Sequence, residues 1–176
     1  VLTIGTGLLS TLIGVFCAWV IACCEFPLKK FFEWALILPL AIPTYVSAYA
    51  YFDILELSNP ILIWVRENIN LEAMQSLNSF FVYFFTILVL SSVLYPYIYL
   101  LARASFLKQG NQLIEAGLSL GHNINEIFWK IALPMARPAV FAGLSLVIME
   151  TLNDYGAVKH FGIPTFTSGI FRTWLG

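Results

Sequence analysis

The chain has 176 residues, of which 60% are hydrophobic and 11% are charged, and its formal net charge is −1. A mean hydropathy of +0.84 is typical of an integral membrane protein and argues against an ordinary soluble domain. The near-neutral charge favours no nucleic-acid partner, so we expect the lipid bilayer as a partner and no nucleic acid.

Four apolar segments predict an all-α fold, a polytopic transmembrane helical bundle that forms a single domain over residues 1–176. Residues 1–24 carry no charge, and 24 helical residues extend about 36 Å, which exceeds the ~30 Å hydrocarbon core of a bilayer. A signal peptide is the alternative for this segment, but it would need a basic leader and a shorter apolar core. The four predicted spans are residues 1–24, 34–52, 80–101 and 138–152.

The basic residues predict the orientation of these spans. Six Lys or Arg residues fall in the segments 25–33 and 102–137, whereas the segment 53–79 holds one, Arg66. The positive-inside rule therefore places the first two segments in the cytoplasm and the third outside, where we also expect a surface-lying helix. The final stretch, 153–176, is expected to lie on the outer face or to re-enter the membrane.

The cytoplasmic segment contains the signals of two short helices joined by a sharp corner. Asn111 can cap a helix over about 112–120, and Gly121 is expected to end that helix in a left-handed conformation. Asn123 and Glu126 have the spacing of a capping box, which predicts a second helix from Ile124 that stops before Pro134. The apolar stripe of this second helix is predicted to consist of Ile124, Ile127, Phe128 and Ile131.

The spacing E-A-G-L-S-L-G, nine residues, I-A-L-P resembles the EAA loop of binding-protein-dependent ABC importer permeases. Gly117 departs from the second alanine of that pattern, a small-for-small change that we expect to alter the loop surface little. The motifs L-P-L-A-I-P at 38–43 and T-L-N-D-Y-G-A-V at 151–158 are similar to the ferric-iron type of these permeases. The positions that match the loop pattern are Glu115, Ala116, Gly121, Ile131, Leu133 and Pro134.

The resemblance implies a multi-pass transmembrane subunit of an ATP-driven importer in the bacterial inner membrane. It implies that the coupling loop, 102–137, docks on a separate ABC ATPase subunit through residues 111–134, and that a solute-binding protein delivers the solute. A second permease half is implied as well, as a homodimer or a fused pseudo-repeat. Since the chain lacks an initiator Met and a stop-like end, we expect a piece of a longer protein, with a further span after residue 176.

Ferric iron is the implied substrate, and thiamine, phosphonate or another small polar solute are the alternatives. The chain has no G-x-x-x-x-G-K-[S/T] sequence, so we expect it to bind no cofactor, with ATP and Mg held by the partner ATPase. It is not expected to be an enzyme or to have catalytic residues or a resident metal site.

Two groups of residues are candidates for the translocation path. Pro39 and Pro43 remove the donors for the carbonyls of Ala35 and Pro39, so the second span should kink, leave acceptors free and present Tyr45 and Tyr49 on the same face. An ordinary kinked packing helix is the alternative, and Tyr95 beside Pro96 presents the same choice. At the outer end of the fourth span, either a path or a structural polar network would explain Glu150, Asn153 and Asp154.

Other classes of protein fit the sequence less well. An ion-coupled secondary transporter would place its coupling carboxylates at mid-span, but Glu150 and Asp154 lie near an end. An intramembrane protease is disfavoured because His122 and His160 are predicted on opposite sides of the membrane. The G-L-S-L-G at 117–121 lacks the strand–turn–helix context of a nucleophilic serine, and the cysteines, which have no C-x-x-C or metal spacing, are expected to be packing residues: Cys17, Cys23 and Cys24.

Overall fold

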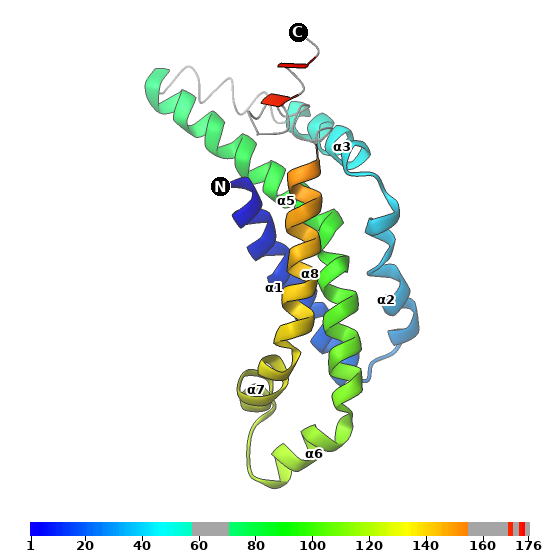
Figure 1. Cartoon of the computed structure of the whole chain (residues 1–176). Coiled ribbons are helices and arrows are strands. Elements are labelled where there is room, and N and C mark those ends of the chain that lie inside the picture. Colours follow the sequence, from blue (N-terminus) through cyan, green and yellow to red (C-terminus); the bar gives the residue numbers. More distant parts are fainter. Residues whose placement is uncertain (58–70, 155–168, 171–172, 175–176) are drawn as a thin grey trace.

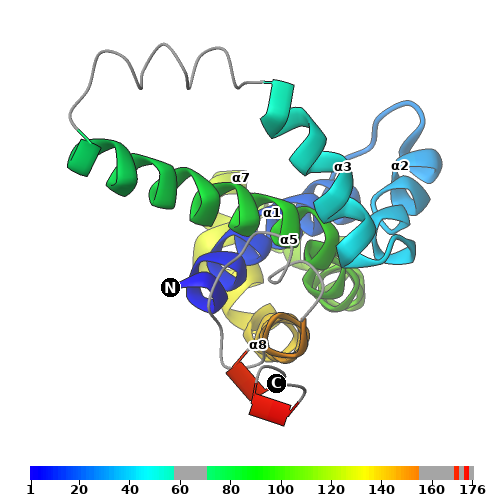
Figure 2. The ribbon, with the colours of Figure 1, turned by 90° about the horizontal axis from the view of Figure 1, so that it is seen from above.

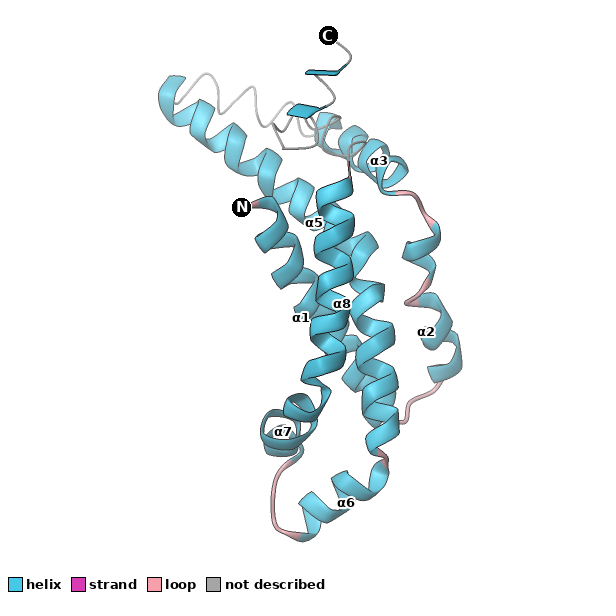
Figure 3. Ribbon diagram, in the orientation of Figure 1, coloured by secondary structure: helices cyan, strands magenta, loops and turns pink. Residues whose placement is uncertain are grey.

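The structure, a computed structural model, describes residues 1–57, 71–154, 169–170 and 173–174, with the side chains of 51–57, 71–79 and 111–113 left out. No strand occurs in these ranges (Figure 3), which confirms the all-α prediction. The elements are α1 (Leu2–Cys23), α2 (Lys29–Ala35), the 3₁₀ turn η1 (Leu38–Ala41), α3 (Thr44–Leu57), α5 (Leu71–Gln109), α6 (Asn111–Ser119), α7 (Ile124–Ile127), the π-helical turn η2 (Phe128–Ala132) and α8 (Leu133–Asn153).

Three helices are long and apolar enough to cross a membrane, and they pack against one another as a bundle of α1, α5 and α8 (Figures 1 and 2). These helices cover the first, third and fourth predicted spans. α5 is longer than expected, with 39 residues and Pro96 inside it. A helix of that length extends about 58 Å, nearly twice the hydrocarbon thickness, so α5 continues beyond the membrane.

The second predicted span, 34–52, is broken. The helical run Lys29–Ala41 meets Thr44–Ala50 at an angle of 92°, which makes this region either a broken span or a re-entrant loop. The predicted bend at the prolines is thus confirmed. The prediction that the Pro39 carbonyl lacks a hydrogen-bond donor was wrong. This carbonyl accepts a hydrogen bond from the Ile42 amide at 3.1 Å, and the Pro43 carbonyl accepts one from Val46 at 3.0 Å. A 3₁₀ turn satisfies a carbonyl that an α-helical partner cannot reach.

Small residues bring the three spanning helices into close contact around Ile98 of α5. A Cβ atom on Gly14 of α1 would lie 2.9 Å from the Ile98 Cβ, and one on Gly143 of α8 would lie 2.8 Å from the Ile98 Cα. Ile98 itself is fully buried. Because lipid is as apolar as a side chain, helices in a bilayer gain stability from such close packing and not from hydrophobic burial alone.

The helix directions agree with the predicted arrangement of the loops. The α1–α2 connection and the α6–α7 region lie at one end of the bundle, and the end of α3 lies at the other (Figure 1). The segments 25–33 and 102–137 therefore share a side, as the charge pattern requires. The predictions for residues 58–70 and 155–168, including the surface helix and most of the re-entrant stretch, lie outside the described residues.

Candidate functional site

The candidate coupling loop begins where α5 ends. Gly110 has φ 72 and ψ 165 and is the N-cap of α6, which starts at Asn111. The prediction that Asn111 caps this helix was therefore wrong by one residue. The positive φ of Gly110 redirects the chain out of α5, so the new helix begins one position earlier than the side-chain signal suggests.

Gly121 ends α6 in the left-handed conformation predicted from the sequence, with φ +83. Its amide donates to the Leu118 carbonyl at 2.9 Å, and the His122 amide donates to the Gly117 carbonyl at 3.1 Å. These two bonds form a Schellman motif, which satisfies the carbonyls that the helix end leaves without partners. The sharp corner thus depends on a conformation that residues with a Cβ adopt only at a cost.

Glu126 holds the corner and the following helix together. Asn123 and Glu126 form the predicted capping box, in which Glu126 Oε2 accepts from the Asn123 amide at 3.3 Å. The same carboxylate contacts Lys130 Nζ at 3.0 Å and His122 Nδ1 at 3.2 Å. The hydrogen bonds from Lys130 and His122 lower the pKa of Glu126 to about 2. Glu126 is therefore ionised at any physiological pH and keeps all three contacts.

The sequence predicted that the second short helix stops before Pro134, but the helical backbone continues past this residue. After one turn of α7 the backbone widens into the π-helical turn η2, and α8 follows without a break. Pro134 lies in the first turn of α8, directly after the π-helical turn, and Pro138 lies inside α8. The helix of the fourth span therefore begins before the predicted residue 138: α8 starts at Leu133, and the continuous apolar helical run starts at Ile124.

The exposed face of the loop carries Glu115 and Ala116, the first two residues of the E-A-G-L-S-L-G motif. Glu115 and Ala116 are exposed, and the Glu115 carboxylate makes no hydrogen bond or ion pair with the described part of the chain. Ser119 donates to the Glu115 carbonyl at 2.8 Å from inside α6, so it lacks the context of a nucleophile. Large apolar side chains are exposed beside this face, namely Leu118, Leu120, Ile124 and Trp129.

Gly117 has a steric role that the sequence analysis missed. It is buried against Ile127, and a Cβ atom at this position would lie 2.7 Å from both Cδ1 and Cγ1 of Ile127. The expectation that this glycine alters the surface little is therefore incomplete, because an alanine here would force Ile127 to move. The predicted stripe is confirmed for Ile127, Phe128 and Ile131, which are buried or half-buried, but Ile124 is exposed.

An aromatic cluster attaches the loop to the spanning helices. The ring of Phe128 in η2 lies 4.9 Å from that of Trp19 in α1 and 6.5 Å from that of Phe106 in α5, between ring centroids. Trp19 and Phe106 are 5.4 Å apart in an edge-to-face arrangement. Gln109 Nε2 also donates to the Ala132 carbonyl at 3.3 Å. A displacement of α7 must therefore act on α1 and α5 through packed side chains.

A second link at the same end joins α2 to α5. Arg103 contacts Glu33 at 3.1 Å with both side chains half-buried, and the Tyr99 hydroxyl donates to the Glu33 carbonyl at 3.3 Å. The sequence analysis counted Arg103 only as a topology signal. The ion pair could have been suggested by the sequence, because Glu33 lies near the start of the second predicted span and Arg103 near the end of the third, on the same predicted side.

The candidate path residues occupy three separate places. Tyr45 and Tyr49 lie on α3 and have 51% and 57% of their surface exposed. Tyr95, in contrast, lies inside the bundle and is only 8% exposed. Pro39 and Pro43 flank the break before α3. The described residues of one chain thus do not bring the tyrosines together, and a path that uses them would need a second half of the transporter.

The acidic candidates gather at the end of α8 that lies opposite the coupling loop (Figure 1). Asp154 caps α8 and is buried, its amide donates to the Glu150 carbonyl at 2.9 Å, and Asn153 is exposed. Nowhere in the described ranges do three His, Cys, Asp or Glu side chains form a group that could hold a metal ion. Glu150 and the buried Asp154 therefore place two carboxylates at this end of α8.

Comparison with known proteins relates nearly the whole chain to transport components. Residues 10–171 match the family described as "binding-protein-dependent transport system inner membrane component". A protein named Fe(3+)-transport system permease protein FbpB 2 from Haemophilus influenzae is 29% identical over 162 residues, which cover 92% of this chain and 28% of that protein.

Relatives named for sulfate occur as well. A probable sulfate transport system permease protein cysT from Chlorokybus atmophyticus is 27% identical over 90% of this chain and 54% of its own length. The sulfate transport system permease protein CysW of Escherichia coli K12 is 27% identical over 83% of this chain and 48% of its own length. The chain thus spans between about a quarter and about half of these relatives.

Proposed function

Because the chain belongs to the family of binding-protein-dependent transport system inner membrane components, we propose that it is the membrane-spanning subunit of an ATP-driven importer. The chain is a multi-pass inner-membrane protein, as its family and its three apolar helices indicate. In this proposal an ABC ATPase binds ATP and Mg, a solute-binding protein delivers the solute, and two permease halves enclose the path.

The exposed corner at Glu115 to Ile124 is the observation that supports this proposal. A helix end with an unpaired carboxylate and a ring of exposed apolar side chains is suited to dock on another protein, since interfaces combine an apolar centre with charged groups that fix register. The Trp19–Phe106–Phe128 cluster behind it supplies the mechanical connection. Closure of the ATPase would then displace α7 and reorient α1 and α5.

Ferric iron is the substrate that we propose, and sulfate is the second candidate. The sequence analysis left other small polar solutes open without naming sulfate, which enters because of the relatives named for it. Ferric iron is a hard cation that prefers carboxylate and phenolate oxygens, whereas sulfate is bound by N–H donors and Arg. The end of the bundle opposite the α6–α7 region bears Glu150, Asp154 and Tyr45, whose side chains carry such oxygen ligands.

Reconstitution tests the function directly. The full-length permease, its ATPase and its binding protein in proteoliposomes are expected to take up iron and not sulfate, and only with ATP inside. Glu115→Lys should weaken retention of the ATPase by placing like charges at the interface, while the isosteric Glu115→Gln should weaken it less. Uptake driven by a proton or sodium gradient without ATP would contradict the proposal and favour a secondary transporter.

The orientation gives an independent prediction. In a background with Cys17, Cys23 and Cys24 replaced by serine, a cysteine at position 115 should react with an impermeant maleimide only after the cells are opened. A cysteine at Pro43 or Asn153 reports on the other end of the bundle, and the Asn153 position should react from outside. Labelling of position 115 in intact cells would overturn both the topology and the coupling role.

A further inference from the structure

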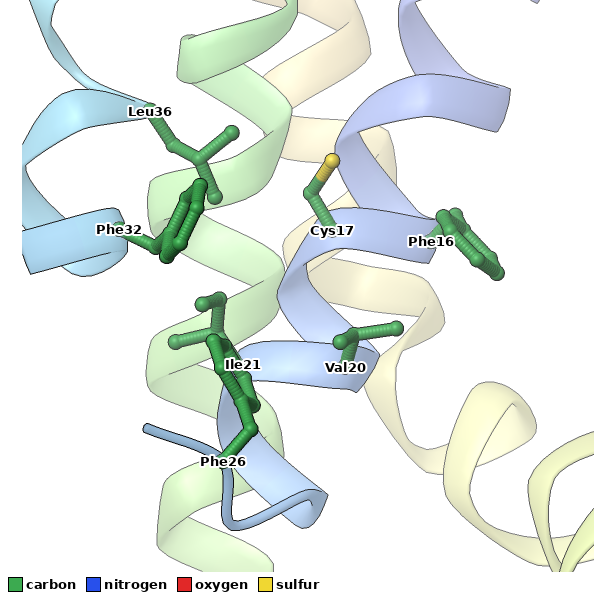
Figure 4. A pocket seen from close by; sticks show the side chains of 7 residues that line it. All are labelled: Phe16, Cys17, Val20, Ile21, Phe26, Phe32 and Leu36. Carbon is green, nitrogen blue, oxygen red and sulfur yellow. The ribbon is translucent and has the colours of Figure 1, made fainter. Parts of the chain in front are cut away.

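An apolar cavity opens between α1 and α2, at the end of the bundle that bears the coupling loop. It measures about 250 Å³ and is lined only by apolar side chains and one thiol: Phe16, Cys17, Val20, Ile21, Phe26, Phe32 and Leu36. Figure 4 shows Phe32 and Leu36 on the α2 side facing Cys17 and Ile21 of α1 across a gap, with α5 passing behind. Phe16 and Phe32 are 67% and 43% exposed, so the cavity opens to the outside of the bundle.

Water is a poor occupant for this cavity. Cavities of about 150 Å³ lined by Leu, Ile and Phe stay dry and accept hydrocarbon ligands, and this one is larger and offers only the weakly polar Cys17 thiol on its walls. One of its walls belongs to α1, a candidate spanning helix, so lipid is the solvent expected at its mouth. A hydrocarbon chain from the bilayer is therefore the group that fills it most favourably.

A basic residue, Lys29, lies on the same face of α2 as the cavity wall. Lys29, Phe32 and Leu36 are spaced i, i+3 and i+7, which places them on one side of the helix and its C-cap. Lys29 is half-buried, and its amide donates to the carbonyl of Phe26, another wall residue, at 3.3 Å. Lys29 thus lies next to the cavity wall along the chain and on the helix face that carries Phe32 and Leu36.

The neighbouring charges leave this ammonium available. Glu33, one turn further on, is bound by Arg103 at 3.1 Å. Lys30 follows Lys29, and both are opposed by Glu25 alone in the α1–α2 connection, which leaves an excess of one positive charge there. The exposed Trp34 on the same helix is typical of a membrane–water interface. The site therefore combines an apolar slot, a cation and an interfacial position.

We propose that this cavity binds one acyl chain of an anionic glycerophospholipid whose phosphate contacts Lys29. A lipid fits because its two parts match the two parts of the site at the right depth, and basic pockets beside spanning helices bind anionic headgroups. The bound lipid would fill the gap beside the α2–α5 ion pair and fix α2 on the bundle. This inference depends on the membrane location and is independent of the transported solute.

The test uses the full-length permease with its partner subunits in nanodiscs of phosphatidylcholine that contain phosphatidylglycerol. Native mass spectrometry should find phosphatidylglycerol retained on the wild-type protein after delipidation. Lys29→Gln should weaken that retention roughly five-fold. Lys108→Gln, which removes an exposed lysine in the last turn of α5, should not weaken it. Equal losses in both variants, or no loss in Lys29→Gln, would overturn the assignment.

A second measurement locates the acyl chain by photocrosslinking. Phosphatidylglycerol with a diazirine in its acyl chain should crosslink to peptides that contain Cys17, Ile21 or Leu36. Cys17→Trp, which fills the cavity, should remove these crosslinks, whereas Leu12→Trp on the exposed outer face of α1 should preserve them. Even labelling along the exposed face of α1, with no enrichment in the peptides that contain Cys17, Ile21 or Leu36, would show that no lipid occupies the cavity.

Discussion

Gly121→Val is expected to abolish most ATP-driven uptake while the permease still inserts into the membrane. Gly121 has φ +83, and a Cβ atom there would meet no atom within 4 Å, so the cost is conformational and not steric. A β-branched residue in the left-handed region is strained by roughly 1 to 2 kcal/mol. The corner would relax to another geometry, the two Schellman bonds would be lost, and the Glu115 face would no longer match its partner.

The measurement is the affinity of the purified permease for its ATPase, together with solute-stimulated ATP hydrolysis. A loss of 1 to 2 kcal/mol in a preformed interface corresponds to roughly ten-fold weaker docking. Gly121→Asn is the matched control, since Asn adopts the left-handed conformation more readily and should keep most of the affinity. If Gly121→Val retains wild-type stimulation and uptake, this loop is not the coupling element.

Gly143→Val is expected to act by a different route, through loss of the folded bundle. A Cβ atom on Gly143 would lie 2.8 Å from the Ile98 Cα and 3.2 Å from the Tyr97 carbonyl oxygen. These are backbone atoms, which cannot rotate away, so α8 and α5 would have to separate. Overpacking of this kind costs about 1 to 3 kcal/mol when side chains can adjust, and here the closest contact is with a helix backbone.

Thermal unfolding of the detergent-solubilised protein measures this effect. The apparent melting temperature should fall by roughly 5 °C or more, and the yield of membrane-inserted protein should fall with it. Ala142→Val adds the same valine to the neighbouring exposed position and should change the melting temperature little. A Gly143→Val protein as stable as the wild type would show that α5 and α8 do not approach this closely.

The two variants separate coupling from folding. Gly121→Val should leave the melting temperature near that of the wild type and remove ATPase coupling, because position 121 faces open space. Gly143→Val should lower both, because a permease that does not hold its bundle cannot present the loop. A shared fall in stability would mean that the corner is part of the folded core and not a docking surface.

Local sequence signals were sufficient wherever the physics is local. The capping box at Asn123 and Glu126, the left-handed Gly121 and the apolar first span all appear as predicted, because a few neighbouring residues decide helix ends and hydropathy alone decides membrane insertion. The bend at Pro39 and Pro43 follows for the same reason, since a missing backbone donor acts on its own turn.

Only the tertiary structure decided which small residues matter and where the helices break and join. Nothing in the sequence distinguishes Gly143 or Gly117 from other glycines, because their importance comes from Ile98 and Ile127, which are distant in the chain or across a corner. The π turn that carries α7 into α8 despite Pro134 is anchored by Trp19 and Phe106. The separation of Tyr45 from Tyr95, and the cavity beside Lys29, likewise arise from how whole helices pack. Sequence patterns record the preferences of each segment, whereas close approach between segments is set by the sum of all contacts in the bundle.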